Sequence, residues 1–124
     1  MLSVRCTSKA HYLVLLNYIK AKETHFRRVY YWDRGSGKTF ALIKLAQKFK
    51  CPILAPTSQS RDYIKSIAHY KKIKGLQVDV VNEFIRDKRY DLVLCDEGIS
   101  QDLLDNIIIP NAKCVVGYCA VGYL

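Results

Sequence analysis

Residues 29–49 read VYYWDRGSGKTFALIKLAQKF, and a change of hydrophobic period within this stretch decides the fold. Its first four residues, Val29 to Trp32, are β-branched or aromatic and predict a strand. The glycines at positions 35 and 37 predict a tight turn. From Ala41 to Phe49 the apolar residues recur at helical spacing, with lysines on the opposite side. We therefore expect a strand, a glycine-containing turn and an amphipathic helix, in this order.

The rest of the chain continues this alternation of short apolar strands and amphipathic helices. Further strands are expected at residues 52–55, 78–81, 92–95 and 114–118. Further helices are expected at residues 10–22, at residues 82–88, and from Ser100, as the cap, to about residue 108. Another helix is expected to begin after a cap at Ser58 or Ser60, with Tyr63, Ile64, Ile67 and Ala68 on its inner face. The pattern predicts a three-layer α/β domain, with a parallel sheet, helices on both faces and right-handed crossovers. We divide this single domain into an N-terminal basic helix (1–28) packed on a core (29–124).

The turn between the strand and the helix has the chemistry of a phosphate-binding loop. Small residues let consecutive backbone N–H groups surround a phosphate, and the helix N-terminus adds positive potential. Lys38 is expected to neutralise the β- and γ-phosphate oxygens, and Thr39 to bind Mg²⁺. The stretch fits G-x-x-x-x-G-K-[ST] except that Trp32 replaces the first glycine. The predicted nucleotide-binding residues are Asp33, Arg34, Gly35, Ser36, Gly37, Lys38, Thr39 and Phe40.

Two carboxylates, Asp96 and Glu97, follow the apolar run at residues 92–95. Ligands of open parallel sheets bind at the carboxyl ends of the strands, so Asp96 can face the phosphate loop. We expect Asp96 to hold Mg²⁺ together with Thr39, and Glu97 to polarise the attacking water, with Lys38 as the second catalytic residue. The alternative is an acidic loop that merely follows a buried strand.

These motifs resemble those of P-loop NTPases of the RecA-like class, which has an additional strand and a catalytic glutamate. Residues 35–39 look like motif I of superfamily 1 and 2 helicases, residues 53–57 like motif Ia, and residues 95–98 like motif II. The same order is similar to viral terminase ATPases and small phage P-loop proteins. The resemblance covers about residues 29–120 and implies a P-loop NTPase core with ATP and Mg²⁺ as cofactors.

The resemblance also implies partners. Thr57, Ser58 and Arg61 would contact a nucleic-acid backbone, although serine and threonine before a helix also serve as caps. A helicase of this type pairs two such domains, the second of which supplies an arginine finger worth about 10³–10⁵ in rate. We therefore expect a homo-oligomer or a partner subunit to complete the site. Residues 116–120 lack the polar sensor that is usual in motif III.

Two other function classes stay open at this point. A nucleoside or nucleotide kinase is one, because some thymidine kinases also combine S-G-K-T with a D-E strand. The other is a module that does not hydrolyse nucleotide but uses it as a conformational signal, or a basic DNA-binding protein with a vestigial loop.

The net charge of +9 is distributed unevenly along the 124 residues. Residues 1–50 carry eleven basic and two acidic groups, whereas residues 51–124 carry nine of each. A one-sided basic surface is typical of proteins with a polyanionic partner. Five cysteines without a CxxC pair argue against a disulfide framework. With no signal peptide and no apolar segment of membrane-spanning length, we expect a cytoplasmic location, in the host cytoplasm if the protein is viral, and no membrane contact.

Overall fold

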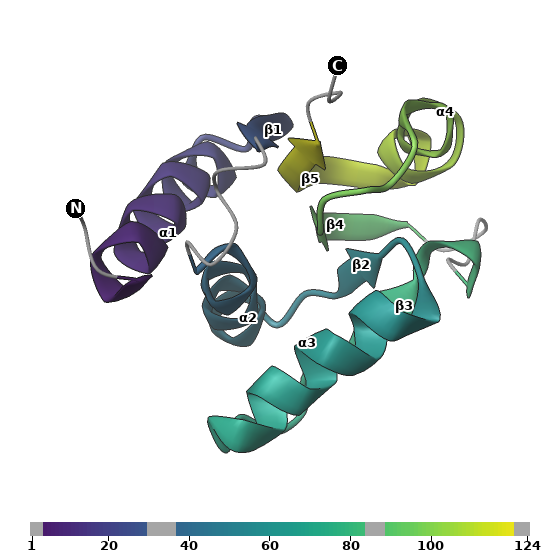
Figure 1. The fold of residues 1–124 in the computed structure, drawn as a ribbon. Helices are drawn as coiled ribbons and strands as arrows, with labels where there is room; N and C mark the ends of the chain where they lie inside the picture. Colours follow the sequence, from purple (N-terminus) through teal and green to yellow (C-terminus); the bar gives the residue numbers. More distant parts are fainter. Residues whose placement is uncertain (1–3, 30–36, 84–88, 121–124) are drawn as a thin grey trace.

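The computed structural model describes residues 4–29, 37–83 and 89–120, and within these ranges five parallel strands form one sheet (Figure 1). The strands are β1 (His25–Val29), β2 (Ile53–Ala55), β3 (Val78–Val80), β4 (Tyr90–Cys95) and β5 (Ala112–Ala120). Their order across the sheet is β1-β5-β4-β2-β3. The last of these strands along the chain thus lies between the first strand and β4.

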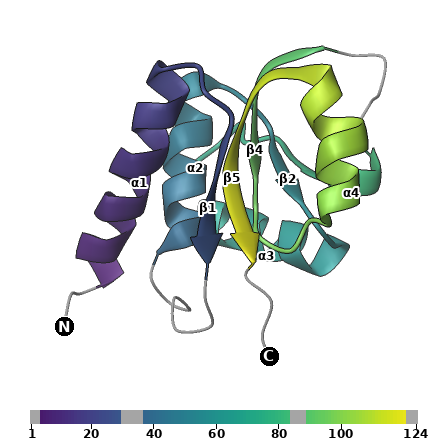
Figure 2. The same cartoon turned by 90° about the horizontal axis from the view of Figure 1, so that it is seen from above.

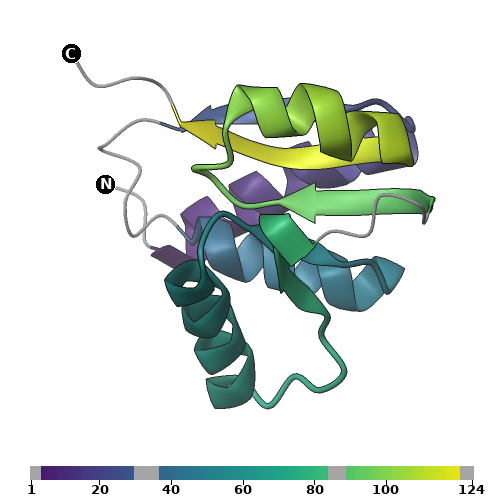
Figure 3. The ribbon, with the colours of Figure 1, turned by 90° about the vertical axis from the view of Figure 1, so that its right-hand side faces the viewer.

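Helices cover both faces of the sheet. On one face lie α1 (Val4–Lys20), α2 (Lys38–Phe49) and α3 (Ser58–Tyr70) (Figure 1). Figure 2 shows α1 and α2 on the side of the sheet opposite to α4. On the other face lies α4 (Gln101–Leu103), which continues as the π-helical turn η3 (Leu104–Ile108) and the 3-10 turn η4 (Ile109–Asn111) (Figure 3). The short 3-10 turn η2 (Val81–Glu83) follows β3. The prediction of a three-layer α/β domain with a parallel sheet is confirmed.

Each face of the sheet has its own hydrophobic core. Neighbouring residues of a strand point to opposite faces, and in β4 Leu94 joins the core under α1, α2 and α3 while Val93 joins the core under α4. The same division separates Val116 from Val115 in β5. The continuous apolar runs in the sequence therefore reflect strands that are buried on both faces.

Several predicted elements have different bounds in the structure. Strands β4 and β5 are longer than predicted, and of the helix predicted at residues 82–88 the structure describes only the turn η2, because residues 84–88 lie outside the described residues. The strand predicted at residues 29–32 is β1, which already begins at His25; Tyr30–Trp32 lie outside the described residues. The helix predicted from residue 10 begins at Val4, because residues 4–9 contain neither glycine nor proline to prevent it. The predicted division between residues 28 and 29 falls inside β1, and Leu15 of α1 packs in the same core as α2.

The inner face of α3 differs from the prediction at one residue. Ile64 and Ala68, spaced four residues apart, are buried, and Ile67 is half-buried. Tyr63 was expected to point inward, but its exposed fraction is 61%. A step of one residue turns a helix by about 100°, so the residue before Ile64 lies at the side of the buried stripe. The prediction of an inward Tyr63 is wrong.

Candidate functional site

The N-terminus of α2 contacts α1 through a glycine. Gly37 is the N-cap residue of α2 and has a φ of 84°, in the left-handed region that favours glycine. A Cβ atom at Gly37 would lie 2.6 Å from Cβ of Ser8 and 3.0 Å from its Cα. Glycine is therefore required here both by the backbone conformation and by the close approach of α1. The predicted nucleotide-binding residues Asp33, Arg34, Gly35 and Ser36 lie outside the described residues.

The two predicted catalytic side chains meet. Nζ of Lys38, in the first turn of α2, lies 3.8 Å from Oε1 of Glu97, which follows β4. The Lys38 side chain is 8% exposed and that of Glu97 is 35% exposed. This distance is an ion-pair contact but is longer than a hydrogen bond of about 2.9 Å. The pair therefore joins two segments that are 59 residues apart in the sequence without locking them in a tight geometry.

Asp96 directly follows β4 and is bonded both to β2 and to the backbone of Glu97. Its backbone N–H donates to the Leu54 carbonyl oxygen of β2 at 3.0 Å, and its Oδ1 accepts from the Glu97 N–H at 2.9 Å. The pKa of the Asp96 carboxyl is raised to about 6, mainly by burial and also by the charge of Glu97, whereas the hydrogen bond from the Glu97 N–H and the charge of Lys38 oppose the rise. An ionised Asp96 is therefore costly in the ligand-free protein.

We expect Asp96→Asn to stabilise the ligand-free protein at pH 7.5 by about 1–2 kcal/mol, since one pKa unit corresponds to about 1.4 kcal/mol and the carboxylate is only partly buried. The raised pKa of Asp96 means that the folded state binds this proton more tightly than the unfolded state does. The wild type therefore loses the corresponding stability as the pH rises through about 6. Urea unfolding at pH 4.5, 6 and 7.5 measures the difference, which should shrink at low pH.

The exposed carboxylate of Asp91, which pairs with Lys113 at 3.3 Å, offers a matched control for this substitution. Asp91→Asn should change the free energy of unfolding by no more than a few tenths of a kcal/mol, because exposed ion pairs contribute little. Equal effects of the two substitutions, or a difference independent of pH, would contradict the assignment of a costly charge at Asp96.

Tyr118 joins the site although residues 116–120 lack the polar sensor that is usual in motif III. It is 1% exposed on β5, between the strands that precede Lys38 and Asp96, and its hydroxyl donates to the Lys38 carbonyl oxygen at 3.4 Å. Its ring forms a T-shaped contact with the ring of His11 of α1, at a centroid distance of 5.6 Å. Burial raises the pKa of this hydroxyl; the charge of Arg27 opposes the rise, and the charges of Asp96 and Glu97 add to it. The available sequence signal is one hydroxyl within the otherwise apolar residues 114–120.

The residues predicted to contact nucleic acid begin α3 on the neighbouring strand–helix unit. Oγ1 of Thr57 accepts from the Ser60 N–H at 3.1 Å, so Thr57, rather than Ser58 or Ser60, caps the helix. Nε of Arg61 lies 3.3 Å from Oδ1 of Asp62. The capping interpretation of Thr57 is confirmed, and nucleic-acid contact by Thr57, Ser58 and Arg61 stays a prediction. The Ser100 cap of α4 is also confirmed, since its Oγ accepts from the Leu103 N–H at 3.3 Å.

The residues predicted to hold Mg²⁺ have suitable chemistry. Thr39 is half-buried in the first turn of α2, and Asp96 is a partly buried carboxylate at the end of β4. Hydroxyl and carboxylate oxygens are ligands that Mg²⁺ prefers, usually together with phosphate oxygens and water. Among the described residues, no three His, Cys, Asp or Glu side chains gather into a metal site. These two residues therefore fit a metal that is bound jointly with a phosphate ligand.

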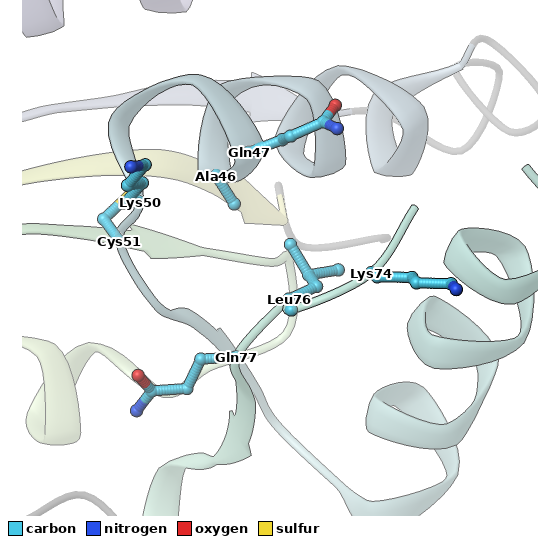
Figure 4. A pocket seen from close by; sticks show the side chains of 8 residues that line it. Ala46, Gln47, Lys50, Cys51, Lys74, Leu76 and Gln77 are labelled. Carbon is cyan, nitrogen blue, oxygen red and sulfur yellow. The ribbon is translucent and has the colours of Figure 1, made fainter. Parts of the chain in front are cut away.

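A pocket of about 400 Å³ opens elsewhere, at the end of α2 opposite Lys38 (Figure 4). Residues of the segment 46–51 line one side of the pocket, and residues 74–77 line the other. The lysines that line it are Lys50 and Lys74, and no residue of the Lys38–Glu97 pair belongs to it. The predicted chemistry therefore lies at the carboxyl ends of the strands and not in this pocket.

The chain was compared with protein-family models, curated proteins and solved structures, and none of them matches it. Across residues 4–29, 37–83 and 89–120, no helix combines the length and the apolar character needed to cross a membrane.

Proposed function

We propose that the protein binds ATP with Mg²⁺ and hydrolyses it, as a P-loop ATPase that acts on or beside nucleic acid. The observation that carries the proposal is the meeting of Lys38 and Glu97 at 3.8 Å, with Asp96 beside them. A buried lysine and two carboxylates at the carboxyl ends of parallel strands are arranged as a phosphate and metal site requires. A role in packing alone does not explain why a buried ammonium group lies beside two carboxylates.

The strand order supports the same proposal. Helix α2 begins at Lys38 and spans 12 residues, so the positive end of its dipole lies at the site. The class that the sequence resembles has an additional strand in its sheet, and in this chain β5 lies between β1 and β4. Because β5 lies between β1 and β4, Tyr118 of β5 reaches the site, where its hydroxyl donates a hydrogen bond to the backbone carbonyl of Lys38.

Each side chain has a separate part in the proposed reaction. Lys38 neutralises phosphate oxygens, and on doing so it releases Glu97 from their ion pair, which at 3.8 Å is readily exchanged. The freed Glu97 carboxylate orients a water molecule and accepts its proton as the water oxygen bonds to the γ-phosphorus. The bond between the γ-phosphorus and the bridging oxygen breaks, and ADP leaves with that oxygen. Thr39 and Asp96 would hold the magnesium ion, which when bound polarises the phosphate oxygens.

The proposal includes a partner, because hydrolysis by this set of residues lacks an assigned arginine finger. We propose that another copy of the chain or a partner subunit supplies it in trans. The kinase alternative predicts phosphoryl transfer to a nucleoside, and the non-hydrolysing alternative predicts ATP binding without phosphate release. Measuring the products of ATP therefore separates the three.

Lys38→Ala is expected to weaken the binding of ATP·Mg²⁺ by about 10–100-fold, since hydrogen bonds to charged groups contribute about 1.5–3 kcal/mol. Isothermal titration calorimetry with a non-hydrolysable ATP analogue measures the affinity. Lys113→Ala is the matched control, because Lys113 is exposed and pairs with Asp91 away from the site. Unchanged affinity of Lys38→Ala would contradict the proposed phosphate site.

A further inference from the structure

The basic residues of this chain gather on the helix layer that contains α2 and α3. Residues 38–77, all of them described, include nine lysines and arginines and a single acidic residue, Asp62. Residues 89–113, which form β4, the α4 segment and the start of β5, include two basic and five acidic residues, and two of these five, Asp96 and Glu97, lie at the site beside Lys38. The even balance of residues 51–124 in the sequence thus conceals two regions of opposite charge. A polyanion would be attracted to the α2–α3 side.

Aromatic rings alternate with lysines on this side. Nζ of Lys44 lies 5.4 Å from the ring centroid of Tyr12 and 5.7 Å from that of Phe40. Nζ of Lys71 lies 5.2 Å from the Phe40 centroid and 5.8 Å from that of Tyr70. We call these five residues the cation–aromatic ladder. It connects α1, the first turn of α2 and the C-terminal end of α3, and Phe40 places it two residues from Lys38.

Two tyrosines of α3 extend the ladder into solvent. Tyr70 is 80% exposed and Tyr63 is 61% exposed. Seven residues complete nearly two helical turns, so these rings lie on one side of α3, about 10 Å apart along its axis. Neither ring contributes to the hydrophobic cores. Proteins bind single-stranded nucleic acid with exposed aromatic rings on a basic surface. The unpaired bases stack on the rings, and the phosphates of the backbone contact the cations.

We propose that the cation–aromatic ladder, together with Tyr63, binds single-stranded nucleic acid. Bases stack on Tyr63 and Tyr70, and the phosphates contact Lys44 and Lys71. Single strands are favoured over duplexes because stacked and paired bases cannot offer their faces to a tyrosine ring. The inference deepens the nucleic-acid part of the proposed function and rests on it, but it does not require the protein to hydrolyse ATP.

The test is fluorescence anisotropy of a labelled oligothymidylate of about 20 nucleotides, measured without ATP over a series of salt concentrations. Tyr70→Ala is expected to weaken binding by about 10-fold, within the range found when a base loses one aromatic partner. Lys71→Gln should weaken binding and reduce the slope of log K against log salt by about 0.7, the contribution of one phosphate contact on a single strand. Both side chains are exposed, so the fold is preserved.

Lys113→Gln is the matched control for Lys71→Gln, because it removes an exposed lysine from the acidic region. The inference is overturned if this control weakens binding as much as Lys71→Gln, if a duplex of equal length binds as tightly as the single strand, or if polyglutamate of equal charge competes equally. The proposed ATP-binding site is tested separately, by the effect of Lys38→Ala on the affinity for ATP·Mg²⁺. Oligonucleotide binding without ATP binding contradicts the nucleotide site alone, and ATP binding without oligonucleotide binding contradicts the ladder alone.

Discussion

Replacing Glu97 by glutamine is expected to reduce ATP hydrolysis by about 10²–10⁴-fold, the usual contribution of a general base, while ATP remains bound. Glutamine keeps the size and shape of the side chain, and its amide oxygen can still face Lys38. It cannot accept a proton from the attacking water. The loss is therefore expected in kcat, whereas the affinity for ATP·Mg²⁺ should change little.

Phosphate release by the wild type and by Glu97→Gln, each with and without single- and double-stranded nucleic acid, measures this effect. Asp102→Asn is the matched control, because Asp102 is an exposed carboxylate in the first turn of α4, on the other face of the sheet. Hydrolysis by Glu97→Gln at the wild-type rate would exclude Glu97 as the base. Transfer of the phosphoryl group to a nucleoside by the wild type would favour the kinase alternative.

Gly117→Ala is expected to reduce the free energy of unfolding by about 3 kcal/mol or more, at the upper end for an overpacked core. Gly117 pairs with Cys95 across β5 and β4. A Cβ atom at this position would collide with the Cys95 carbonyl oxygen and lie 2.8 Å from its backbone N. Backbone atoms of a central strand cannot rotate away, so β4 must shift. Asp96, the next residue, would shift with it.

Urea unfolding compares Gly117→Ala with Gly75→Ala. Gly75 also has a positive φ of 76°, but a Cβ atom there would meet nothing within 4 Å. Gly75→Ala should therefore cost only the left-handed backbone strain, about 1–2 kcal/mol. An equal or smaller loss for Gly117→Ala would show that β4 and β5 can separate freely. If Gly117→Ala remains folded, we also expect it to lose ATP·Mg²⁺ affinity, because Asp96 moves.

Most elements could be predicted from the sequence because their signals are local. The apolar runs before Asp96 and within residues 52–55 are strands, and Ser100 caps its helix, as their residue types predict. Two predictions about α3 were wrong, because the cap of a helix and the direction of a side chain depend on single positions within a turn. Thr57 rather than a serine caps α3, and Tyr63 lies beside the buried stripe. Thr57 lies one residue before Ser58 and three before Ser60, and Tyr63 lies one residue before the buried Ile64. A pattern of hydrophobicity does not resolve shifts of this size.

The sequence by itself determined the composition of the candidate site. Lysine and threonine after a glycine turn, and two carboxylates after an apolar strand, are chemical identities that no folding step changes. These identities predict a phosphate and metal site wherever the two segments meet.

Only the tertiary structure decided what lies between and around them. The order β1-β5-β4 brings the buried Tyr118 hydroxyl to Lys38, and α1 brings Ser8 against Gly37. The same packing collects the lysines of α2 and α3 on one side of the sheet and places Asp102 and Asp105 of the α4 segment on the other. Strand order and the side on which a helix packs depend on contacts between distant segments, and these are set by burial of whole faces rather than by any local pattern.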